Sequence, residues 1–197
     1  MLFSGKTGNL FFDWHKPIGE FVLGLILFRI VWGFAGSSNA KILPLIARPS
    51  AVLVHLKELV TGRLRPERGH NAAGGWAVVL MLLLIGFQAV SGMLIADEEE
   101  FVEGRFYGLL DESMMFTLLS LHKINSNLLM TVVIVHISMI AVYRLRGKQN
   151  LLSAMITGRM KWPENEPMEL YTPQRWWVGL CLVITVFALV GWLSLWF

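Results

Sequence analysis

Two histidines lie within an otherwise apolar stretch of this chain and are its strongest candidates for chemistry. His122 and His136, with Lys123, are the only charged or imidazole side chains in residues 116–143. Ionisable residues inside membrane spans are costly and are commonly functional. A separation of 14 residues is about 3.9 turns, so both side chains project from one helix face, about 21 Å apart. One metal cannot bridge that distance, which predicts two stacked sites and excludes a compact zinc or copper cluster.

The same spacing recurs near the start of the chain, between His15 and Arg29. If the two helices run in the same direction, His15 and His122 share one level near the outer surface, and Arg29 and His136 share a deeper one. His15 and His122 could then ligate one iron, and Arg29 could pair with a haem propionate. Two alternatives stay open: membrane histidines also hydrogen-bond across helices, and Arg29 could extend to the inner interface.

If His136 binds a haem iron, that iron needs a second axial ligand, and His70 is the one candidate at the inner side. Its depth fits poorly, because His70 precedes the nearest apolar segment by about one turn, whereas His136 lies about 12 Å from Arg144 along its helix. We therefore expect the inner ligand to be missing from this chain. His55 is expected on a solvated or lipid-facing surface, and we assign it no role.

The elements that must position these residues are membrane helices. The chain has 197 residues, of which 55% are hydrophobic and 16% charged, against about 25% charged in soluble domains. A bilayer needs about 20 apolar residues per helix, and the longest such windows are residues 18–34, 74–96, 116–143 and 176–197. We predict an all-α, integral membrane four-helix bundle with helices near residues 15–36, 74–96, 116–143 and 176–197. Asp13 is expected to cap the first helix, and Pro17 suits its first turn.

The loop charges predict the orientation of these helices. Residues 37–73 and 144–175 each carry six Lys or Arg, whereas residues 97–118 carry seven acidic residues and one Arg. The basic loops are expected in the cytoplasm, so both termini lie outside, in the periplasm. Residues 49–60 have apolar residues at helical spacing, which predicts an interfacial or packed loop helix.

The remaining composition excludes several classes of protein. The single cysteine, Cys181, cannot form an internal disulfide, and no C-x-x-C-H motif for covalent haem attachment occurs. No basic cluster is dense enough to indicate nucleic-acid binding. A small transporter would need polar residues along several helices, and the second and fourth predicted helices contain almost none.

Four motifs in order resemble one family. They are FRIVWGFAGS at residues 28–37, GHNAAGG around His70, the His-x13-His pair at 122 and 136, and NLLSAMITGRMKW at residues 150–162. Over residues 13–162 the chain is similar to bacterial cytochrome b561, in the branch that includes the cytochrome b subunit of membrane nickel-iron hydrogenases. Residues 1–162 are expected to form this membrane domain, and residues 163–197 a linker and an additional transmembrane helix.

The resemblance implies a carrier with two b haems, each held by two histidines. His15 matches the ligand at the start of the family's second helix, and His122 and His136 match the two ligands of its fourth, with His15 paired to His122. Arg29 matches the family's conserved-motif arginine, and His70 matches the GHN motif, in which Ala72 stands where proline is usual. The family's first helix, which supplies the fourth ligand, is expected to be absent. A late start codon, a ligand from another polypeptide, and a single haem are the open explanations.

The expected function is transmembrane electron transfer in the bacterial inner membrane, between a partner redox protein and the quinone pool. The partner could be a hydrogenase, a c-type cytochrome or a similar subunit, recruited by the acidic outer segment, and quinone is expected near Arg29, Arg68 and His70. Such a chain would be an electron-transfer subunit without a self-contained active site. The alternative is a haem-poor anchor or scaffold subunit of a larger respiratory or photosynthetic complex.

Overall fold

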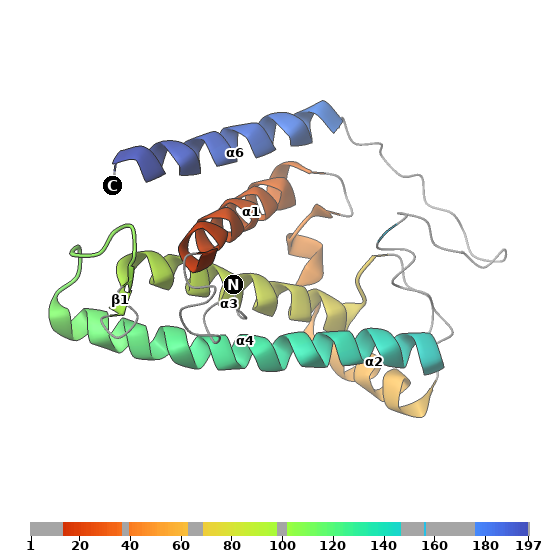
Figure 1. The fold of residues 1–197 in the computed structure, drawn as a ribbon. Helices are drawn as coiled ribbons and strands as arrows, with labels where there is room; N and C mark the ends of the chain where they lie inside the picture. Colours follow the sequence, from red (N-terminus) through yellow and green to blue (C-terminus); the bar gives the residue numbers. More distant parts are fainter. Residues whose placement is uncertain are drawn as a thin grey trace.

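A computed structural model describes residues 14–36, 40–62, 69–97, 102–146, 156 and 176–196 of the chain. In these segments the fold is a bundle of helices, shown in Figure 1. Its elements are α1 His15–Ala35, η5 Leu43–Leu45, α2 Pro49–Thr61, α3 Ala72–Leu94, β1 Ala96–Asp97, β2 Val102–Glu103, α4 Glu112–Arg146 and α6 Trp176–Trp196. The predicted helices are confirmed as elements, with bounds that differ by a few residues at most ends.

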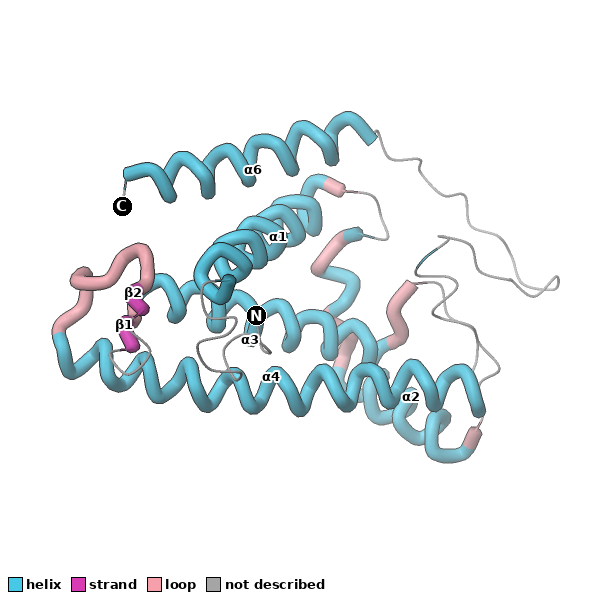
Figure 2. Tube along the Cα trace, in the orientation of Figure 1, coloured by secondary structure: helices cyan, strands magenta, loops and turns pink. Residues whose placement is uncertain are grey.

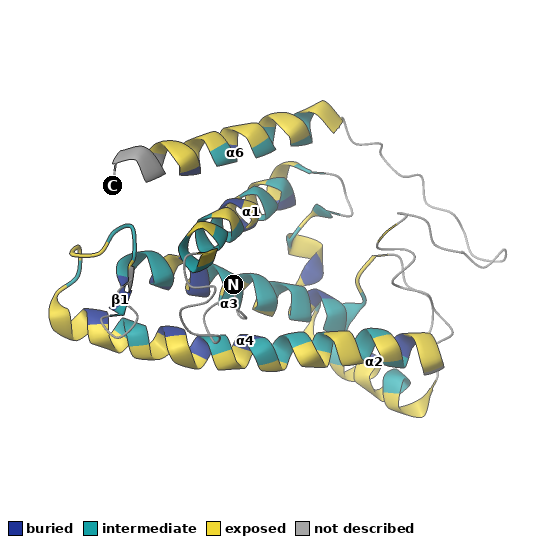
Figure 3. Ribbon diagram, in the orientation of Figure 1, coloured by how far each residue is buried: buried dark blue, intermediate teal, exposed yellow. Residues whose placement is uncertain are grey.

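Three of the described helices are long and apolar enough to cross a membrane: α1, α3 and residues Glu112–Leu145 of α4. A fourth apolar stretch, Trp176–Trp192 in α6, is shorter. Large apolar side chains such as Leu83, Ile124 and Trp192 are exposed on these helices, and Figure 3 shows exposed residues along most outward faces. An apolar exterior of this extent is typical of a surface that faces lipid.

The ends of the helices follow from local chemistry. The side-chain oxygen of Asn71 accepts a hydrogen bond from the Gly74 amide at 2.7 Å and so caps α3. Asp111 does the same for the Met114 amide at the start of α4. The helix α2 ends at Gly62, whose positive φ of 72° forms a left-handed cap. The predicted cap of α1, Asp13, lies outside the described residues.

The helix α3 is the central element, because it packs against α1, α2, η5 and α4. Gly75 allows close approach, since a Cβ there would meet the backbone carbonyl of Leu45 in η5. The helix α6 packs along α1 (Figure 1), where the rings of Phe21 and Phe187 have centroids 5.2 Å apart. A glycine at position 24 makes room for Phe187 at this contact.

Helices α1 and α4 run in the same direction and α3 runs in the opposite one, as the alternation of spans requires. The start of α1, the end of α3 and the first third of α4 therefore meet at one end of the bundle. A short hairpin follows α3 there, with Ala96 paired to Glu103 in the antiparallel β1–β2 ladder (Figure 2). Two ion pairs fix this end: Arg105 to Glu20 at 2.8 Å and Lys123 to Asp97 at 3.0 Å.

Candidate functional site

The histidines predicted to share one level lie together in the structure. The ring centroids of His15, from the first turn of α1, and His122, from α4, are 6.3 Å apart, with an interplanar angle of 70°. His122 is buried, with 8% of its surface exposed, and His15 is half-buried. The depth count along two parallel helices therefore placed this pair correctly.

Both ring nitrogens of His122 contact α3. Its Nδ1 lies 2.8 Å from the Ser91 hydroxyl, and its Nε2 lies 2.8 Å from the Gln88 side-chain nitrogen. Ser91 and Gln88 are among the most buried residues, at 1% and 2% exposure. The ring is thereby fixed in direction by a helix other than its own.

A third polar residue, Asn125, extends this contact. It lies one turn after His122 on α4, is buried, and donates from Nδ2 to the Gln88 side-chain oxygen at 2.6 Å and to the Leu84 carbonyl at 3.0 Å. Asn125 acts on the ring of His122 through Gln88. Two other polar residues of α4, Ser120 and Thr131, donate to carbonyls of their own helix.

Gln88 and Ser91 were missed by the sequence reasoning, although a signal for them existed. They are the only side chains of residues 74–96 with amide or hydroxyl groups, and they lie three positions apart, on one helix face. A depth count on the neighbouring antiparallel helix would have placed both residues at the level of His122.

The inner end gathers a second group. Partial desolvation of the His70 ring, the positive charge of Arg29 and then that of His136 lower the pKa of His70 below its ordinary value. The charges of Arg29, from α1, and of His136, from α4, thus act on the His70 ring in the turn before α3. The expected mismatch in depth between His70 and His136 stays a prediction.

Arg29 has a structural contact of its own. Its Nη1 donates to the Ala40 carbonyl at 2.7 Å and so ties the segment after α1 to the helix. The following motif residue, Trp32, stacks on Phe28 with centroids 5.8 Å apart. Arg68, expected beside them, lies outside the described residues.

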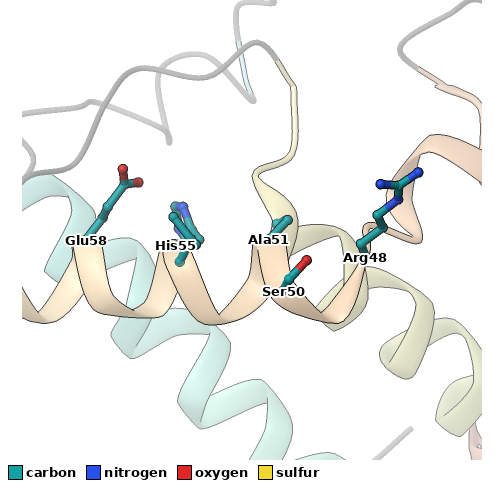
Figure 4. Close-up of a pocket in the computed structure, with 7 residues that line it drawn as sticks. Arg48, Ser50, Ala51, His55 and Glu58 are labelled. Atoms are coloured by element: carbon teal, nitrogen blue, oxygen red, sulfur yellow. The ribbon is translucent and has the colours of Figure 1, made fainter.

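The expectation that His55 is solvated or lipid-facing is wrong. His55 is 4% exposed, because α2 packs on the bundle and the ring lies against Tyr143 of α4, with its Nε2 hydrogen-bonded to the tyrosine hydroxyl. Asn71 donates to the same hydroxyl at 2.9 Å. A shallow pocket of about 490 Å³ borders His55, Arg48 and Glu58 (Figure 4).

The separation of the His15 and His122 rings is that of two imidazoles on one iron, while both ring nitrogens of His122 contact α3 in the structure. Within the described part of the chain, no three His, Cys, Asp or Glu side chains gather at one point. Two imidazoles on opposite sides of an iron, with Fe–N bonds of about 2.0–2.1 Å, have ring centres roughly 6 Å apart. The observed 6.3 Å meets this requirement.

The model of the family described as prokaryotic cytochrome b561 matches residues 1–158. No curated protein and no solved structure matches the chain.

Proposed function

The chain belongs to the prokaryotic cytochrome b561 family, and from this premise we propose that it passes electrons across the membrane through b-type haem held between His15 and His122. The family implies a membrane protein that binds haem b and transfers electrons. The residues that bind the haem, the electron donor and the electron acceptor are our proposal.

The observation that carries the proposal is the geometry of the histidine pair. The ring centroids of His15 and His122 lie 6.3 Å apart, at the end of the bundle that carries the β1–β2 hairpin. The two rings come from different helices, and that of His122 is buried. A haem with two histidine ligands has no open coordination position, so it supplies one-electron transfer and not oxygen chemistry. Ser91 fixes the ring of His122, and the Arg105–Glu20 ion pair fixes the chain beside His15.

The inner end is proposed to serve quinone. Arg29 supplies a permanent positive charge that acts on the His70 ring at the opposite end of the bundle from His15. Such a charge favours the negative charge that develops on a quinone during reduction. His136 would be the ligand of a second haem where a further nitrogen ligand is provided. Its position about 21 Å from His122 along α4 would continue the electron path across the bilayer.

The orientation and the partner are proposed from charge. Acidic residues such as Asp97, Glu103, Asp111 and Glu112 gather at the end of the bundle that holds His122. This acidic end would face the periplasm of a bacterial inner membrane, with α6 as a fourth span and both chain termini outside. A basic face on a donor protein would be attracted to it, in a manner that weakens with salt. The chain would then be one subunit of a larger redox complex.

The deciding experiment compares haem content in three proteins purified in mild detergent. A pyridine haemochrome assay on the full chain is expected to give at least one b haem per polypeptide. His122→Ala is expected to lose the reduced-minus-oxidised signal of the His15–His122 site. His55→Gln, at the other end of the bundle, serves as the matched control and is expected to keep it.

The two possible failures have different meanings. An unchanged spectrum in a folded His122→Ala variant would overturn the assignment of the ligands. A folded full chain without haem would overturn electron transfer itself and leave the anchor or scaffold role. That second role gains some support from His122, whose ring nitrogens both have protein partners in the structure.

A further inference from the structure

The polar contacts around His122 form one continuous chain of hydrogen bonds that begins and ends at backbone carbonyls of α3. Asn125 contacts the Leu84 carbonyl and the Gln88 oxygen, Gln88 contacts His122, and His122 contacts Ser91. The Ser91 hydroxyl in turn donates to the Gln88 carbonyl at 3.3 Å. The four side chains that form these hydrogen bonds are buried, so water does not offer them alternative partners.

The carbonyl at one end decides the direction of every bond. A carbonyl oxygen only accepts, so the group of Asn125 that faces Leu84 must be its amide nitrogen. That same nitrogen donates its second proton to the Gln88 oxygen at 2.6 Å. The Gln88 nitrogen is then the group that faces His122, and it donates to Nε2 at 2.8 Å. Nε2 must accept, and therefore carries no proton.

The contacts at the other end are compatible with this assignment. Nδ1 lies 2.8 Å from the Ser91 hydroxyl, and that hydroxyl lies 3.3 Å from the Gln88 carbonyl. Because Nε2 carries no proton, the neutral ring carries its proton on Nδ1 and donates it to Ser91, which in turn donates to the Gln88 carbonyl. The direction set at the Leu84 carbonyl therefore selects one neutral tautomer, with the lone pair on Nε2.

We propose that Gln88 and Asn125 hold His122 in the tautomer that binds iron through Nε2, and that the Gln88 amide occupies this nitrogen until the haem replaces it. The proposal rests on His122 as a haem ligand and adds the residues that prepare it. When haem is bound, His122 would give up the hydrogen bond from Gln88 and offer the lone pair of Nε2 to the iron. It would release no proton, because the ring proton lies on Nδ1, where Ser91 accepts it. Gln88, Asn125 and Ser91 are positioning residues.

Ser91 has a consequence for the potential of the bound haem. An acceptor on the Nδ1 proton makes the imidazole a stronger electron donor to iron, which favours the ferric state. Ser91→Ala removes the acceptor and is expected to raise the midpoint potential of the His15–His122 haem. Ser120→Ala, a hydroxyl bonded to its own helix at Phe116, is the matched control and is expected to leave it unchanged.

The direct test is nitrogen NMR of the full chain, expressed without haem and labelled with ¹⁵N-histidine in detergent micelles at pH 7.5. The signal that disappears in His122→Gln belongs to His122. It is expected to show an unprotonated Nε2 and a protonated Nδ1. Gln88→Glu supplies a carboxylate, which only accepts, so the proton is expected to move to Nε2. Haemin uptake by that variant is expected to slow about tenfold or more, since the competent form becomes the minor one.

The outcomes separate this proposal from the proposed function. A protonated Nε2 in the haem-free wild-type chain overturns the role of Gln88 and Asn125, even where His122→Ala loses its haem. An unprotonated Nε2 together with haem retained in His122→Ala leaves the tautomer assignment standing and overturns only the ligand assignment. The wild-type measurement decides the proposal where Gln88→Glu fails to fold.

Discussion

Gly92 lies beside the ring of His122 and limits where that ring can be. A Cβ at this position would lie 3.1 Å from the ring carbon Cε1, which is tighter than ordinary contact. Gly92→Ala is expected to displace the ring and to lower the free energy of unfolding by about 1–3 kcal/mol through overpacking. This loss is partly offset by the better helix propensity of alanine. Thermal unfolding and the electron paramagnetic resonance signal of the ferric haem check both effects.

The matched control is Gly86→Ala on the same helix. Its Cβ would meet Ile26 at 3.8 Å, an ordinary contact, so the propensity gain should remain without the displacement. Equal unfolding temperatures and identical spectra in the two variants would contradict the packing argument.

His70 is expected to make stability depend on pH. Its pKa is lowered in the folded protein, first by desolvation and then by the charges of Arg29 and His136. Between the lowered pKa and the ordinary value of about 6.5, the unfolded chain therefore binds more protons than the folded one. The contribution to stability is complete above that ordinary value and is lost as the pH falls below it.

The measurement is the unfolding temperature at pH 5.5 and at pH 7.5, for the wild type and His70→Gln. The wild type is expected to lose more stability on acidification than the variant. At pH 7.5, where His70 is neutral in both states, any difference between them reports only effects that do not depend on protonation. Parallel pH profiles would show that His70 does not titrate in this way.

At the residue scale, spacing alone predicted that His15 and His122 lie together, but it did not predict the side chains that orient the His122 ring. Equal offsets along parallel helices fix depth, because each residue advances a helix by about 1.5 Å. The partners Gln88 and Ser91 come from the antiparallel helix, where the depth of a residue has to be counted in the opposite direction along the sequence. His55 was misplaced for a related reason, since α2 buries the face that carries this imidazole and leaves its apolar neighbours Val54 and Leu56 exposed.

At the element scale, the packing of α3 against the η5 turn depends on one glycine. A Cβ at Gly75 would meet the Leu45 carbonyl, and backbone cannot rotate away as a flexible side chain does. Gly75→Ala is expected to push the turn off the helix and cost about 1–3 kcal/mol. Gly191→Ala in α6, where a Cβ meets nothing within 4 Å, is the control and should be neutral or stabilising. Thermal unfolding of both variants decides, and equal stability would argue against this contact.

The helices themselves were predictable because the bilayer sets a strict requirement. A span must be apolar for about 20 residues and must satisfy its own backbone hydrogen bonds, so a charge-free window identifies it. Their ends were less predictable, since caps such as Asn71 and Asp111 depend on one side-chain contact. The helix α4 extends to 35 residues, longer than the apolar window, because polar residues at its first turn continue the helix outside the apolar region.

At the scale of the whole molecule, the structure separates an acidic end, which holds His15 and His122, from a basic end. The acidic end holds the hairpin with Asp97 and the ion pair of Arg105 with Glu20. The opposite end holds Arg29, His70 and the loop helix α2. A transmembrane electron carrier needs two chemically distinct ends, one for a protein donor and one for a lipid-soluble acceptor, and this asymmetry agrees with the proposed function.

The loop charges predict on which side of the membrane each end of the bundle lies. The Lys and Arg of residues 40–73 are expected to stay in the cytoplasm, which places the carboxyl end of α6 outside. Alkaline phosphatase, which is active only in the periplasm, should be active when fused after Phe197 and inactive when fused after Arg146. A green fluorescent protein at the same two positions should give the opposite pattern, because it does not become fluorescent after unfolded export. Reversed signals at both positions would place the His15–His122 end in the cytoplasm and would overturn the proposed orientation.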